Sequence, residues 1–88
     1  MTNAPLLSNF VSLTGGIVNM TSHLEATYQT NEITKEIKAF ESEYGDTWTI
    51  VWRVYYSDED YLENVMYVDS RERAERVVRK TANRWIDE

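Results

Sequence analysis

Few side chains in this sequence could take part in catalysis or bind a metal. The chain has 88 residues with a single histidine, His23, and no cysteine. A Ser-His-Asp triad would depend on His23 alone. The lack of cysteine rules out thiolate zinc sites, iron–sulfur clusters, cysteine nucleophiles and disulfides. No nucleophile with an oriented base is recognisable beside His23, so we expect no enzyme activity, no metal site and no cofactor.

An acidic cluster around an aromatic residue is the first candidate binding site. It comprises Asp58, Glu59, Asp60 and Glu63, with Tyr61 between them. A calcium loop needs a glycine at its sixth position, where a loop starting at Asp58 has Glu63. The cluster instead favours contact with a basic protein surface, with Tyr61 as an aromatic anchor. The alternative is that the acidic residues only keep the edge of a hairpin soluble.

A basic stripe near the C-terminus is the second candidate binding site. Spacings of three or four residues put side chains on one face of a helix, and this is the spacing of Arg73, Arg76, Lys80 and Arg84. Such a stripe suits phosphates or an acidic partner. Alternatively, it is a solvated face whose cations pair with nearby glutamates. Because the chain carries a net charge of −6, direct binding to nucleic acid is not expected.

Aromatic residues are frequent in the second half of the chain. Trp48, Trp52 and Tyr56 lie on one face of a predicted strand, so we assign them to the core. Tyr55 and Tyr67 are then exposed on the opposite side of the sheet, and they share a surface if the strand register aligns them. A stacking platform for single-stranded nucleic acid would need interleaved cations, and only Arg53 is present.

The first half of the chain contains one strand pattern and one helix pattern. Polar and apolar residues alternate from Gly16 to Gln29, which predicts a strand with a bend near Ser22 and His23. Before it, residues 14–16 form a turn signal, and residues 1–14 are a hairpin arm, a short helix or a flexible arm. From Asn31 to Tyr44 the apolar residues follow the spacing of one helical stripe, which predicts a helix. The residues of that stripe are Ile33, Ile37, Phe40 and Tyr44.

The second half predicts a hairpin followed by a helix. Residues 47–56 alternate with a period of two, residues 57–60 interrupt the pattern, and Val65 to Val68 resumes it. Asp69 and Ser70 are candidate caps of a last helix. Its apolar stripe comprises Ala74, Val77, Val78, Thr81, Trp85 and Ile86.

These elements predict an α+β fold in a single small domain, residues 1–88, with residues 1–8 as a flexible N-terminus. The expected architecture is an antiparallel sheet of three to four strands with two helices packed on one face. The element order is β(β)α–ββα, or αβαββα if residues 4–13 are helical. With 42% hydrophobic and 12% aromatic residues, the chain is too apolar to be disordered.

The function expected from these features is protein–protein binding without chemistry. In size and charge, though in no motif, the chain is similar to phage-type inhibitors of host nucleic-acid-processing enzymes, which implies a basic or nucleic-acid-processing partner. The alternatives are a homo-oligomeric structural or accessory protein, plausibly a homodimer, and a nucleic-acid-binding regulatory module that uses the basic helix. The first 24 residues lack the basic start of a signal peptide, and no apolar run reaches the roughly 18 residues of a membrane span. We therefore expect a cytoplasmic protein without a membrane segment.

Overall fold

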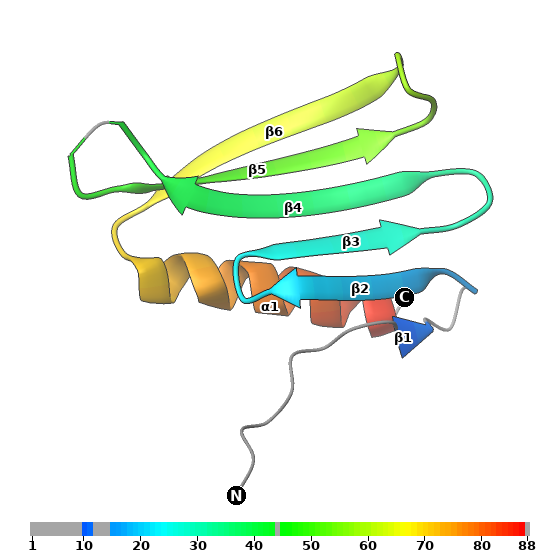
Figure 1. Ribbon diagram of the computed structural model, residues 1–88, viewed down its shortest axis with the longest axis horizontal. Coiled ribbons are helices and arrows are strands. Elements are labelled where there is room, and N and C mark those ends of the chain that lie inside the picture. The colour runs from blue at the N-terminus through cyan, green and yellow to red at the C-terminus, as the bar shows by residue number, and fades with distance from the viewer. Residues whose placement is uncertain (1–9, 12–14, 44, 88) are drawn as a thin grey trace, which may run out of the picture.

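An antiparallel sheet with one C-terminal helix makes up the computed structural model, which describes residues 10–11, 15–43 and 45–87 (Figure 1). The strands are neighbours in chain order, each antiparallel to the next, so the sheet is a meander. Since β1 has two residues, the sheet consists mainly of five strands of five to eight residues. The elements are β1 (Phe10–Val11), β2 (Ile17–Ser22), β3 (Glu25–Gln29), β4 (Thr34–Glu41), β5 (Trp48–Tyr55), β6 (Tyr61–Val68) and α1 (Arg71–Asp87).

The helix predicted for residues 31–44 is wrong, because most of this segment is the central strand β4. Ile33 and Ile37 are four residues apart, a spacing that suits one face of a helix and one face of a strand equally well. Phe40 decides between them: Ile37 is buried beneath α1, whereas Phe40 is 49% exposed on the other side of the sheet. Ladders with β3 and β5 on both sides outweigh the local helical pattern. The expected sheet of three to four strands with two helices is therefore wrong as well.

The strand predicted from Gly16 to Gln29 is two strands. The expected bend is a complete reversal at His23 and Leu24, with a register shift between Met20 and Ser22. Phe10 and Val11 pair antiparallel with β2, as the hairpin alternative for this segment requires. Residues 1–9 and 12–14, which include the predicted flexible N-terminus, lie outside the described residues.

The last helix is confirmed. The Ser70 hydroxyl accepts a hydrogen bond from the Arg73 amide at 3.2 Å, so Ser70 is the N-cap. Asp69 instead forms an ion pair with Arg73 at 3.3 Å. In the described part of the chain no helix is long and apolar enough to cross a bilayer. The buried residues of α1 are Ala74, Val78, Thr81, Ala82 and Trp85.

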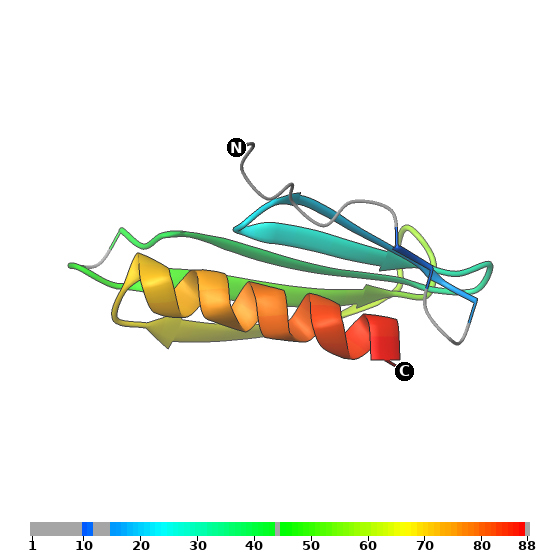
Figure 2. The same cartoon turned by 90° about the horizontal axis from the view of Figure 1, so that it is seen from below.

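The core lies between α1 and one side of the sheet (Figure 2). Val18, Tyr28, Ile37 and Ile50 supply the sheet side of this core, and the Trp85 ring lies 6.0 Å from the Tyr28 ring. The helix makes most of its contacts with β3 and β4 and fewer with β5 and β6. Within the described residues no helix covers the opposite side of the sheet, called here the open face. β6 lies largely outside the cover of α1.

Candidate functional site

β6 is an edge strand whose two faces are both exposed. Every residue from Tyr61 to Tyr67 is exposed, although most are apolar or aromatic. The exposed fractions are 44% for Tyr61, 61% for Leu62, 46% for Val65, 37% for Met66 and 60% for Tyr67. Strands with apolar residues on both faces are normally covered on both. The composition of β6 therefore indicates a strand that binds a further element.

On its outer side, the backbone of β6 has groups that no other described strand pairs with. The Tyr56 amide donates to the Asp60 carbonyl at 2.8 Å. Opposed residues in an antiparallel ladder alternate between hydrogen-bonded and non-hydrogen-bonded pairs. Because Tyr56 and Asp60 are hydrogen-bonded, the even-numbered residues of β6 form the hydrogen-bonded pairs with β5. The Ser42 amide bond to the Thr47 carbonyl gives the same alternation from the β4 side. The odd-numbered residues, Tyr61, Glu63, Val65 and Tyr67, therefore direct their N–H and C=O groups away from the described sheet.

β6 lacks the features that usually keep edge strands from pairing with other chains. Such strands are commonly short, bulged, interrupted by proline or strongly charged. At the opposite edge the described residues contribute β1, a strand of two residues. β6 has eight residues in unbroken register with β5, contains no proline and carries one charge, Glu63.

A polar row crosses the open face beside β6. The Arg53 guanidinium donates to the Glu63 carboxylate at 2.7 Å and to the Tyr55 hydroxyl at 3.1 Å. Tyr55 in turn donates to Glu36 at 2.9 Å. The hydrogen bonds to Tyr55 and Glu63 raise the pKa of Arg53 above its ordinary value. Arg53 also lies 5.3 Å from the centre of the Tyr61 ring, so this row holds Tyr61 against the sheet.

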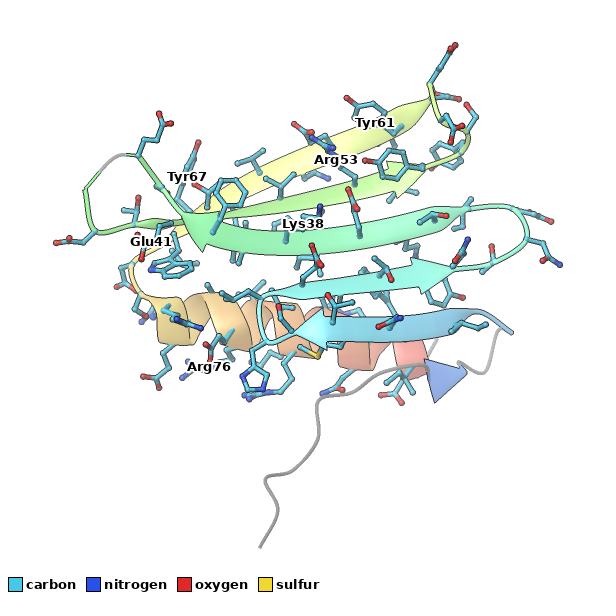
Figure 3. All side chains as sticks on the ribbon, in the orientation of Figure 1. Lys38, Glu41, Arg53, Tyr61, Tyr67 and Arg76 are labelled. Atoms are coloured by element: carbon cyan, nitrogen blue, oxygen red, sulfur yellow. The ribbon has the colours of Figure 1, made fainter. Side chains whose placement is uncertain are left out.

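An apolar area adjoins the polar row on the open face. The register places Phe40, Thr49 and Tyr67 in one row and Lys38, Val51 and Val65 in the next. Figure 3 shows Tyr67 near one end of β6 and Arg53 and Tyr61 nearer the other. Phe40 and Tyr67 are about half exposed or more, so the open face of β4 to β6 combines aromatic surface with a fixed ion-pair network.

The side of the sheet that faces α1 contains a groove between the C-terminal half of the helix and strands β4 to β6. Its volume is about 470 Å³. Leu62 and Met66 lie on the same face of β6 as Asn64 and continue the apolar floor toward the free edge. The lining residues are Lys35, Glu36, Trp52, Arg53, Val54, Asn64, Thr81, Arg84 and Trp85.

The structure divides the predicted acidic site between two elements. Asp58, Glu59 and Asp60 are exposed in the loop between β5 and β6, whereas Tyr61 and Glu63 belong to β6. The Glu63 carboxylate forms an ion pair with Arg53. The described residues contain no group of acidic or histidine side chains arranged to hold a metal ion.

The predicted basic stripe is exposed along α1, but acidic partners interrupt it. Arg73 pairs with Asp69, and Arg76 pairs with Glu72 at 3.3 Å. Lys80 and Arg84 are exposed, and Arg84 also lines the groove. The stripe is thus a mixed-charge helix surface with two cations toward its C-terminal end.

The predictions for the aromatic residues are correct in part. Tyr55 and Tyr67 do share the open face, and Tyr67 is exposed as expected, but Tyr55 is half-buried. Trp48 and Trp52 are half-buried against the core, but Tyr56 is 52% exposed and is not a core residue. Sequence reasoning missed the first half of β6 because it assigned residues 61–64 to the acidic connection.

The surface of β6 therefore has three parts: the outer backbone, the open face and the groove beside α1. His23, the one histidine, is exposed in the turn between β2 and β3 and contributes to none of them. Comparison with protein-family models, curated proteins and solved structures finds no match to this chain.

Proposed function

We propose that this chain is a non-enzymatic protein-binding domain that presents β6 to an extended strand of its partner. The observation that supports this proposal most strongly is the eight-residue free edge with apolar side chains exposed on both faces. In strand addition, main-chain hydrogen bonds supply affinity and the alternating side chains supply specificity.

Each part of the β6 surface has a role in this mode of binding. The outward amides and carbonyls of Tyr61, Glu63, Val65 and Tyr67 would pair with the incoming strand. Side chains of that strand would extend the open face on one side and the groove on the other. The Arg53 network already fixes Tyr61 and Glu63, so little side-chain freedom remains to be lost there on binding.

The more specific expectation of an inhibitor of a nucleic-acid-processing enzyme stays a prediction. It rests on the size and charge of the chain and on the exposed Asp58, Glu59 and Asp60. A cytoplasmic location also stays a prediction, supported by the absence of the cysteines that small secreted domains use as staples.

Site-specific photo-crosslinking in cells that produce the chain tests the proposal. A photoreactive residue replaces Leu62, which is 61% exposed on β6. A matched control replaces Asn83, which is exposed on α1. We expect a discrete adduct of defined mass from position 62 and none from position 83. Absence of an adduct at position 62, or the same adducts at both positions, would overturn the assignment of β6 as the binding strand.

A further inference from the structure

We propose that the partner of β6 is a second copy of this chain, joined edge to edge in an antiparallel ladder with Asn64 on the two-fold axis. This inference rests on the proposed function and names its partner. It follows from the pattern of free backbone groups along β6 and from the side chains that a two-fold axis would bring together.

Symmetry restricts how two β6 strands can pair. An antiparallel pair related by a two-fold axis perpendicular to the sheet keeps each face on its own side, and directly opposed residues share a face. The residue numbers of every opposed pair then add up to the same even number. The axis must therefore pass through a residue, and Glu63, Asn64 and Val65 are the central candidates.

An axis through Asn64 uses all the free groups. Tyr61 then opposes Tyr67 of the second copy, and Glu63 opposes Val65 of the second copy. These four odd-numbered residues of each strand form hydrogen-bonded pairs, giving about eight main-chain hydrogen bonds. On the groove side, Leu62 meets Met66 of the second copy, and the two Asn64 amides meet each other with a donor and an acceptor apiece.

The two neighbouring registers are worse. An axis through Glu63 places the two Glu63 carboxylates directly opposite each other, which is destabilising, and leaves Tyr67 without a strand partner. An axis through Val65 opposes Glu63 to Tyr67 of the second copy and Asn64 to Met66. Both registers form about six main-chain hydrogen bonds instead of eight. The sequence of β6 is thus most self-complementary about Asn64.

The available area indicates a dimer of moderate affinity. The exposed parts of the five apolar and aromatic side chains of β6 amount to on the order of 500 Å². Stable interfaces bury about 800 Å² per partner. Edge pairing adds backbone to the buried surface but covers only part of each side chain, so we expect a dissociation constant in the micromolar range.

The first measurement is the molar mass of the purified chain by light scattering or sedimentation from about 1 to about 200 µM. We expect the mass to rise toward twice the 10.4 kDa of one chain. A single 10.4 kDa species at the highest concentration would overturn the second-copy proposal. The proposed function would survive that result if position 62 still crosslinked to a different protein.

The register is tested with single cysteines, which the cysteine-free chain makes unambiguous. Asn64→Cys puts two thiols directly opposite in a non-hydrogen-bonded pair, with Cα atoms about 4.5 Å apart, within the range of a disulfide. Leu62→Cys is the control. Its thiols would be four residues out of register, about 13 Å apart, and Leu62, like Asn64, is exposed. We expect Asn64→Cys to form a disulfide-linked dimer at least tenfold faster under mild oxidation. Equal rates, or faster linkage through Leu62→Cys, would overturn the proposal.

Discussion

Proline substitutions at Val65 and Met66 provide a matched test of the free edge. The two residues are adjacent in β6 and similarly exposed, at 46% and 37%. The backbone pattern nevertheless predicts opposite roles for their amides. The Val65 N–H points outward, whereas the Met66 N–H belongs to the hydrogen-bonded pair with buried Ile50.

The expected costs differ because only one substitution removes a hydrogen bond within the sheet. Val65→Pro constrains the backbone on a free edge, where proline is tolerated, and should cost about 1 kcal/mol. Met66→Pro leaves the Ile50 carbonyl unpaired and sets the proline ring against β5, which should cost about 3 kcal/mol or more. For a domain of this size the difference corresponds to roughly 8–16 °C in Tm.

Thermal unfolding followed by circular dichroism measures both variants. The samples should be dilute enough for all proteins to be monomeric, since binding of any partner shifts the apparent stability. Val65→Pro should remain folded yet lose self-association and crosslinking from position 62. If Val65→Pro unfolded at or below the temperature of Met66→Pro, the assignment of outward and inward amides in β6 would be refuted.

Three further predictions concern the fold and the assembly. Gly16→Ala should cost about 1–3 kcal/mol in urea unfolding, because the added Cβ meets the buried Tyr28 ring; a neutral result would contradict that close approach. Ser70→Ala should cost about 1 kcal/mol through the lost bond to the Arg73 amide, and unchanged stability would show that Ser70 does not cap α1. Raising the salt concentration from about 0.05 M to about 0.5 M should strengthen self-association, because each chain carries a charge of −6 and salt screens the repulsion. Weaker association in sedimentation at the higher salt would argue for an interface held by ion pairs.

The sequence was sufficient to predict the elements whose apolar residues repeat with the period of a strand or of a helix, but not of both. Alternation in β5 is continuous, and the stripe of α1 begins after a capping serine. Both elements lie close to where they were predicted. That Tyr55 and Tyr67 share a face follows from the strand register, which the sequence left open.

β4 could not be predicted because its decisive partners are remote in sequence. Its charged residues look like the outer face of a helix, yet Lys38 pairs with Glu25 at 3.5 Å and Glu36 lies 3.9 Å from Arg53 on neighbouring strands. Such cross-strand pairs stabilise a sheet and become visible only once the register is known.

The candidate site was predicted by charge, whereas the structure emphasises an apolar edge. Tyr61 and Glu63 were identified correctly as surface residues, but as part of an acidic loop rather than of β6. The alternating apolar residues on both faces of residues 61–68 were present in the sequence as a signal. The acidic run from Asp58 to Asp60 obscured it, because acidic residues are depleted in strands.

Amide hydrogen exchange along β6 tests most directly whether its free edge is the binding surface. At concentrations where the mass is doubled, the amides of Tyr61, Glu63, Val65 and Tyr67 should exchange as slowly as those of their even-numbered neighbours. On dilution, or in Val65→Pro, the remaining odd-numbered amides should become fast while the even-numbered ones stay protected by β5. Fast exchange of the odd-numbered amides in the assembled protein would contradict edge pairing through β6.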